Sequence, residues 1–218
     1  SGGFVGGQDA TMPDPIVLWE FDHRWERRQL QALRGQSDFE ARVGYSDPST
    51  LDLAIDTTDP NCPSDFATAQ PQPITHISHL SYMGLSVGEP AIGTVAINGI
   101  SATETVQRPV AVFSAGLNGD IPGGSACESR LRRGRAIYVV DLQTGSILRR
   151  FLDYRTDNGD TFRFQAEVAG TPVLFDNRPG VVASRAFVGD VAGRLFRIDL
   201  SDPDITKWSV DLAYDPCQ

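Results

Sequence analysis

The sequence predicts an all-β protein built from short antiparallel strands joined by many turns. Gly 21 and Pro 14 together make up about one in six of the 218 residues, which is typical of strands punctuated by turns. From residue 90 onward, short apolar runs rich in β-branched and aromatic residues alternate with such turns. Hydrophobic residues form 40% of the chain, enough to fill a core.

The charge of the chain argues against a nucleic-acid-binding protein. Binding to nucleic-acid phosphates needs a basic surface, whereas this chain has a formal net charge of -9 and a pI near 4.7, so no nucleic-acid partner is expected. No apolar run approaches the ~20 residues of a transmembrane helix, so no transmembrane segment is expected. The chain starts at Ser1 rather than Met and shows no signal peptide, so we expect residues 1–218 to be a fragment of one domain.

The first third of the chain is mixed in character. Residues 16–21 (IVLWEF) read as an apolar strand. Residues 22–34 carry many charges, and Trp25, Leu30 and Leu33 give a partial helical stripe, which predicts a short surface helix. Residues 44–75 are rich in Asp, Ser, Thr and Pro and predict a long loop. We therefore assign residues 22–83 to an insertion or loop region.

The remainder predicts strands in pairs. Residues 91–97 and 109–114 read as strands, and Asn98-Gly99 is a strong hairpin-turn pair. Residues 135–140 and 146–151 flank a turn that runs from Asp141 to Gly145, where glycine suits a positive φ. Further short strands are expected at 173–175, 186–189 and 195–200.

Two of these turns repeat a pattern. Asp141 stands 49 residues before Asp190, and each follows a strand and precedes a glycine. A period of roughly 40–50 residues with several short strands is typical of the blades of a β-propeller. About nine or ten strands would give two or three four-stranded blades, with the rest of the ring absent or supplied by another chain. A β-sandwich with similar hairpins is the alternative.

Six blocks of sequence carry a family resemblance. They are residues 9–15 (DATMPDP), 18–21 (LWEF), 88–92 (GEPAI), 134–141 (GRAIYVVD), Thr144-Gly145 and 189–200 (GDVAGRLFRIDL). In this order they resemble the C-terminal β-propeller of the PilY-type proteins of type IV pili, with residues 84–200 matching best. The resemblance implies that the following residues are structural: Trp19, Gly134, Asp141, Gly145, Gly189, Asp190, Gly193 and Asp199.

The resemblance also implies a function. It predicts an exported, extracellular bacterial protein at the pilus (fimbrium) that serves pilus biogenesis, twitching motility or cell adhesion at the pilus tip, without enzymatic activity. Expected partners are minor pilins or other pilus proteins, and a host or abiotic surface. Members often carry an acidic Asp-x-Asp-Gly-Asp-Gly stretch, but residues 175–180 (FDNRPG) hold one carboxylate and an arginine. Calcium binding is not expected in this loop.

A second stretch is a candidate calcium site. Asp153, Asp157, Asn158 and Asp160 surround Gly159, and hard cations prefer several oxygen ligands from a tight turn. A hairpin turn with solvated acids is the alternative reading. His76 and His79 have no third metal ligand near them in the sequence, so surface histidines are expected. Apart from this calcium candidate we expect no cofactor.

A basic cluster is the candidate binding site. Arg130, Arg132, Arg133 and Arg135 could hold an acidic partner or an anionic polysaccharide, or form a solvated loop. Neither Ser125 nor the segment 114–116 has the context of a nucleophile elbow, and no phosphate-binding or dinucleotide motif is present, so no catalytic residue is assigned.

The three cysteines do not form a metal-binding or redox motif. Cys62, Cys127 and Cys217 lack CxxC spacing, which leaves one disulfide or three free thiols open.

Two alternative functions remain. Thr144-Gly145 also occurs in the propellers of quinoprotein dehydrogenases, which need a quinone and a calcium ion. A scaffold subunit of an outer-membrane assembly is the other alternative.

Overall fold

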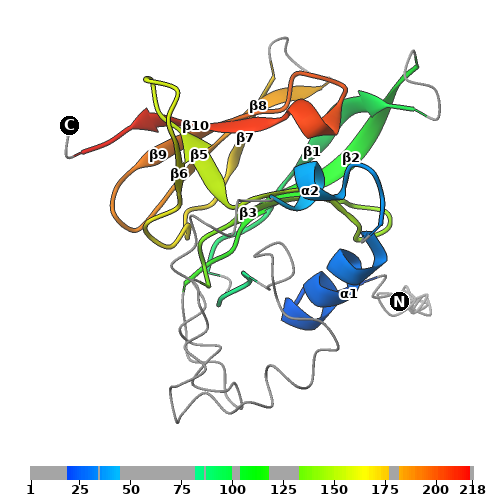
Figure 1. Ribbon diagram of the computed structural model, residues 1–218, viewed down its shortest axis with the longest axis horizontal. Coiled ribbons are helices and arrows are strands. Elements are labelled where there is room, and N and C mark those ends of the chain that lie inside the picture. Colours follow the sequence, from blue (N-terminus) through cyan, green and yellow to red (C-terminus); the bar gives the residue numbers. More distant parts are fainter. Residues whose placement is uncertain are drawn as a thin grey trace, which may run out of the picture.

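The computed structural model describes residues 19–33, 35–44, 82–85, 87–99, 104–117, 133–176 and 182–216. Ten strands and two α-helices form in these ranges, so the chain is mostly β as predicted. In this part of the chain no helix is long and apolar enough to cross a membrane. Figure 1 shows two sheets with the helices gathered beside one of them.

The first sheet has four strands in chain order. It contains β1 (Ala91–Asn98), β2 (Thr105–Ser114), β3 (Ile137–Asp141) and β4 (Ile147–Phe151), and every neighbouring pair is antiparallel. Apolar and β-branched residues dominate β3, which is buried along its whole length. The sheet is therefore a simple up-and-down meander with a fully covered central strand.

The second sheet has six strands in the order β6-β5-β10-β9-β8-β7. Its main part is another antiparallel meander, with β7 (Val173–Asp176), β8 (Ala183–Gly189), β9 (Leu195–Asp199) and β10 (Ser209–Tyr214). The 3-10 helix η3 (Ile205–Lys207) leads into β10. The hairpin of β5 (Asp153–Arg155) and β6 (Thr161–Arg163) extends the sheet, because β5 pairs in parallel with β10 at Asp211. Among the described residues neither sheet closes on itself.

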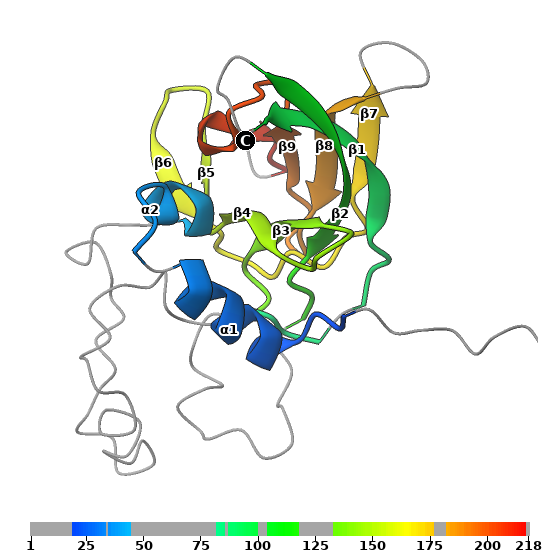
Figure 2. The ribbon, with the colours of Figure 1, turned by 90° about the vertical axis from the view of Figure 1, so that its right-hand side faces the viewer.

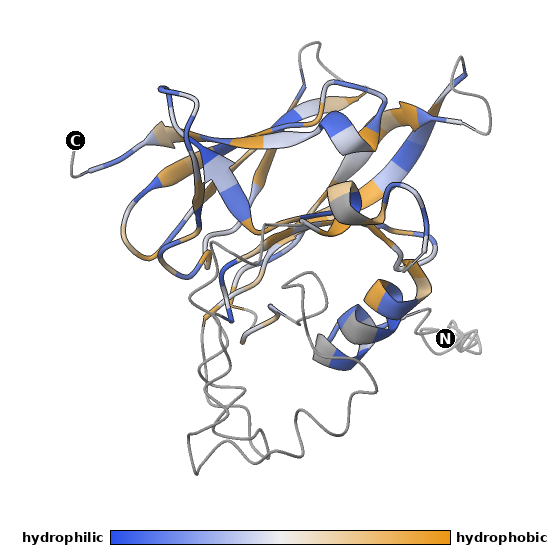
Figure 3. Cartoon of the chain, in the orientation of Figure 1, coloured by the Kyte–Doolittle hydropathy of each residue, from blue (hydrophilic) through white to orange (hydrophobic). Residues whose placement is uncertain are grey.

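The two sheets pack face to face around one apolar core. Figure 2 shows them on opposite sides of the space that the core fills, and Figure 3 shows hydrophobic and hydrophilic residues alternating along their strands. Both sheets contribute buried residues, among them Val95, Val112, Val139, Val188 and Phe196. Contact is close where β1 meets β7, since a Cβ on Gly93 would lie 2.6 Å from Leu174 Cδ1.

The helices cover the other side of the four-stranded sheet. Apolar residues of α1 (His23–Leu33) and α2 (Phe39–Val43) pack with Ile147 of β4. Arg42 of α2 donates to the carbonyls of Ile147 and Leu148 at 2.5 and 3.3 Å, and so occupies the open edge of β4. The predicted helix is confirmed, and its Leu30 and Leu33 pack against the sheet. The described part of 22–83 belongs to the packed structure.

A buried ion pair joins α1 to the sheet. Glu26 and Arg150 are both fully buried, and Arg150 Nη1 lies 2.8 Å from Glu26 Oε1. The Tyr138 hydroxyl donates to the same oxygen at 2.8 Å. The backbone N–H groups of Tyr82 and Met83 donate to Oε2, and Arg150 Nε donates to the Val43 carbonyl at 2.9 Å. The pKa of Tyr138 is raised well above its usual value. Burial of the hydroxyl is the main cause, and the nearby Glu26 carboxylate adds to it.

Two predictions of local structure were wrong. The described end of the first predicted strand, residues 19–21, belongs to no strand, and Trp19 and Phe21 instead pack on the outer side of β3. Asn98-Gly99 is not a two-residue hairpin turn, because Asn98 pairs with Thr105 and Gly99 N–H donates to the Glu104 carbonyl. The segment around Asp153–Asp160 forms the hairpin of β5 and β6, in line with the hairpin-turn alternative.

Breaking the buried Glu26–Arg150 pair should strongly destabilise the packing of the helices on the sheet. We expect Glu26→Gln to lower the free energy of unfolding by about 3–5 kcal/mol, because it leaves the Arg150 charge buried without its partner. Urea unfolding followed by tryptophan fluorescence measures this. Asp211→Asn is the control, since it removes one carboxylate from partly exposed pairs that are worth under about 1 kcal/mol. Equal losses in the two variants would contradict the proposed role of Glu26.

Candidate functional site: the outward face of the six-stranded sheet

Apolar side chains gather on the outward face of the six-stranded sheet, opposite the core. The register places Val173 of β7 beside Phe187 of β8, and Phe175 beside Arg185. The rings of Phe175 and Phe187 meet edge to face with centroids 5.9 Å apart. Val173 and Phe175 are exposed, so the β7 end of this face is apolar and open to solvent.

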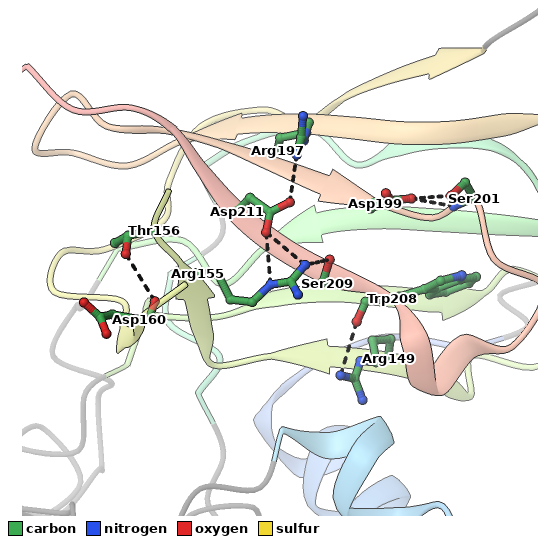
Figure 4. Close-up of polar contacts among 10 residues, drawn as sticks. All are labelled: Arg149, Arg155, Thr156, Asp160, Arg197, Asp199, Ser201, Trp208, Ser209 and Asp211. Carbon is green, nitrogen blue, oxygen red and sulfur yellow. Dashed lines mark hydrogen bonds and ion pairs between the residues drawn. The ribbon is translucent and has the colours of Figure 1, made fainter. Parts of the chain in front are cut away.

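A ladder of charges crosses the middle of the same face. Asp211 on β10 accepts from Arg155 of β5 at 3.0 Å and from Arg197 of β9 at 2.9 Å, as Figure 4 shows. Arg155 also donates to the Ser209 hydroxyl at 2.7 Å. These guanidinium groups are about half exposed, so the ladder orders the side chains but adds little stability.

Asp199 continues the ladder toward Arg185. The two residues are opposite each other in the register of β8 and β9. Burial alone would raise the pKa of Asp199. Hydrogen bonds from the Ser201 hydroxyl and N–H outweigh it, together with the nearby charges of Arg185 and Arg197, so the pKa of Asp199 lies below its usual value. Asp199 therefore stays ionised and helps to neutralise the arginines.

Two adjoining hollows open on this face. One of about 480 Å³ is lined by Arg185, Phe187, Arg197 and Asp211, with Thr156 and Asp157 from the β5–β6 turn. The other, of about 490 Å³, shares Thr156, Asp157, Leu212 and Ala213 and adds residues at the tip of that hairpin. Aromatic, guanidinium and carboxylate groups thus lie side by side, an arrangement suited to recognition. This surface was not predicted from the sequence, because its residues come from separate strands.

The structure does not bring the four candidate calcium ligands together. Asp157, Asn158 and Asp160 line the second hollow, but Asp153 lies in β5. Burial raises the pKa of Asp153, although the charges of Arg163 and Arg149 act to lower it. Two arginines of the chain therefore already lie near this carboxylate. Across the described residues no group of three or more His, Cys, Asp or Glu side chains could hold a metal ion.

The candidate arginine cluster is divided. Arg130 and Arg132 lie outside the described residues. Arg133 is buried, with 2% of its surface exposed, and Arg135 is half-buried. Of the four, Arg135 is thus the one that the structure describes near the surface. His76, His79, Ser125, Cys62, Cys127 and Cys217 also lie outside the described ranges.

The turn after β3 shows what the motif residues do. Asp141 Oδ1 accepts from the N–H groups of Gln143 and Thr144 at 2.8 and 3.0 Å. Gly145 has a φ of +71°, and its carbonyl accepts from Trp25 Nε1 at 2.9 Å. Trp19 Nε1 donates to the Leu142 carbonyl at 2.9 Å. Two tryptophans from the N-terminal side therefore hold this turn in place.

The turn after β8 is built in a similar way. Asp190 Oδ1 accepts from the N–H groups of Ala192 and Arg194, and its Oδ2 accepts from Arg194 Nε at 2.9 Å. Gly193 has a φ of +84°. These carboxylates close turns within their own hairpins. Both accept from backbone N–H groups, and Asp190 also accepts from the Arg194 side chain.

The turns at Asp141 and Asp190, predicted to be equivalent, occupy different positions in the two four-stranded meanders. The Asp141 turn joins the third and fourth strands of its meander, whereas the Asp190 turn joins the second and third strands of the other. The equivalent of Asp141 is therefore Asp199, which also ends a third strand and accepts from the N–H two residues later, on Ser201, at 2.9 Å. The two turns looked alike in sequence because the same Asp-to-Gly chemistry suits any tight hairpin.

The comparisons with known proteins give one similarity. No family model matches the chain, and no curated protein matches it. Among solved structures the chain is similar to the crystal structure of the Pseudomonas aeruginosa PilY1 C-terminal domain, with 22% sequence identity and a TM-score of 0.39. The similarity covers 61% of this chain and 25% of that one. A likeness at this level does not assign a function.

Glycine at position 145 is needed for two separable reasons. Gly145 and Gly159 both have positive φ, so alanine at either should cost roughly 1–2 kcal/mol in the free energy of unfolding. A Cβ on residue 145 would also lie 2.9 Å from the Trp19 ring, whereas one on residue 159 has nothing within 4 Å. We expect Gly145→Ala to lose about 1–3 kcal/mol more than Gly159→Ala in urea unfolding. Equal losses would show that Trp19 does not pack on the turn.

Proposed function

We propose that this chain is part of a non-enzymatic, exported protein of the type IV pilus, which acts in pilus biogenesis or adhesion at the pilus tip. Its sheets serve as blades of a β-propeller that presents surfaces for binding. The observation that carries this proposal is the pair of four-stranded meanders, β1 to β4 and β7 to β10, stacked face to face. A propeller blade has the same number of strands in the same antiparallel arrangement.

The positions of the family-like blocks support the same assignment. Residues 134–141 lead into and form β3, and residues 189–200 span the end of β8, its turn and β9. The carboxylates of these blocks form hydrogen bonds within turns. A scaffold for binding therefore fits these residues better than a reaction. Minor pilins or other pilus proteins, and a host or abiotic surface, are the proposed partners.

Counting surface pili tests the proposed function. We expect a strain that lacks the gene to lose surface pili or surface attachment, as seen by electron microscopy and an adhesion assay. Complementation with the wild-type gene should restore both. The Gly159→Ala gene is a useful second complement, because an exposed turn change should restore pili as the wild type does. Normal pili together with normal attachment in the deletion strain would contradict the proposal.

A further inference from the structure

We propose that the fold directs a spontaneous covalent modification to Asn158, whose side-chain amide is converted to a carboxylate through attack by the Gly159 backbone nitrogen. The two residues lie in the turn between β5 and β6, and Asn158 lines the second hollow. The fold protects a second Asn-Gly pair, Asn98-Gly99, from the same reaction. Since the reaction needs only water, the inference goes beyond the proposed function and does not depend on it.

The reaction exchanges ammonia for water in two steps. The Gly159 nitrogen loses its proton and attacks Cγ of Asn158. The bond from Cγ to the side-chain nitrogen breaks, and ammonia leaves with a proton in place of the one that the glycine nitrogen lost. Water then opens the resulting cyclic imide at either of its carbonyl carbons, which gives aspartate or isoaspartate at position 158. Glycine suits this reaction best as the following residue, because it has no Cβ to shield its nitrogen.

The β5–β6 turn leaves the reacting atoms of Asn158 and Gly159 accessible. Both residues are exposed, and a Cβ on Gly159 would have nothing within 4 Å. The Thr156 hydroxyl donates to the Asp160 carbonyl at the base of the turn (Figure 4). Within the turn, the Gly159 N–H donates to the Thr156 carbonyl at 2.8 Å, and this bond must open before the nitrogen reacts. A bond at an exposed hairpin tip opens at low free energy, so Asn158 reacts without unfolding of the sheet.

Asn98-Gly99 is the same dipeptide in a protected setting. Asn98 ends β1, where it pairs with Thr105 and donates its N–H to the Pro203 carbonyl at 2.8 Å. The Gly99 N–H donates to the Glu104 carbonyl at 2.7 Å, and a Cβ on Gly99 would lie 3.0 Å from a Glu104 carboxylate oxygen. The imide can form at Asn98 only after its backbone leaves the extended conformation, which breaks the end of β1. Reaction at Asn98 therefore waits for local unfolding.

Conversion of Asn158 changes the chemistry of the second hollow. Asp157, Asp160 and Asp215 already line this hollow, and none of the described residues around it is an arginine or a lysine. A further carboxylate makes the hollow more attractive to cationic groups and less attractive to anionic ones. Isoaspartate also adds a methylene to the backbone of the turn, which displaces the Gly159 N–H from its acceptor. The edge of the candidate site thus changes as the protein ages.

Peptide mapping of the full protein tests this inference. The purified protein would be kept in warm neutral buffer, and samples taken over several weeks would be digested briefly with pepsin at acidic pH, where the reaction is slow. Mass spectrometry would follow the amide-to-acid mass change at Asn158 and at Asn98, and electron-transfer fragmentation would identify isoaspartate. A parallel sample in guanidinium chloride is the control, because both dipeptides are unfolded there. Asn118-Gly119 lies outside the described residues and does not enter the comparison.

We expect Asn158 to convert about tenfold faster than Asn98 in the native protein, which corresponds to an opening free energy about 1.4 kcal/mol higher at Asn98. The two rates should become similar in guanidinium chloride. Gly159→Ala should slow conversion at position 158 and leave Asn98 unchanged, because the added Cβ shields the nitrogen. Equal rates in the native protein would overturn the inference, as would a native Asn158 that stays unconverted. A difference of the same size in guanidinium chloride would also overturn it, because neighbouring residues rather than the fold would then set the rates.

Discussion

The Glu26–Arg150 pair is the contact on which the arrangement of the helices and the first sheet depends. Both side chains are fully buried, and the pair brings α1, β4 and the segment at Tyr82 to one point. Such a pair is strongly destabilising when broken but adds little net stability against an apolar core. Its contribution is therefore mainly one of position, because a helix shifted by one residue would leave both charges unpaired.

The fixed position of α1 explains which faces of the two sheets are covered and which are open to solvent. With α1 held in place, α2 lies along β4, and Arg42 occupies carbonyls that an edge strand would otherwise expose. The tryptophans before and within α1 hold the turn after β3. The β3–β4 side of the first sheet is thus covered, whereas the outward face of the second sheet remains open. If the protein binds a partner through the described residues, as we propose, that open face is the surface available for it.

The sequence predicted local features better than long-range ones. β1, β3 and β4 were predictable because apolar runs end at turn residues, and the helix because Leu30 and Leu33 share a face. β5 and β6 have three residues each, too few for a period to emerge. Glu26 and Arg150 are 124 positions apart, so their pairing has no local signal. The outward face was missed because Phe187 and Arg197 become neighbours only through strand register.

Native-state hydrogen exchange tests most directly whether the buried pair makes the helices and the first sheet one cooperative unit. The amides of α1, β3 and β4 would be compared in the wild-type protein under conditions that favour folding. We expect α1 to open with nearly the same free energy as β3 and β4, because separating them would break the buried Glu26–Arg150 ion pair and expose the Arg150 side of the sheet. Exchange of α1 at a much lower free energy than β3 would show that the helix is a loose cover, and would contradict the role given to the pair.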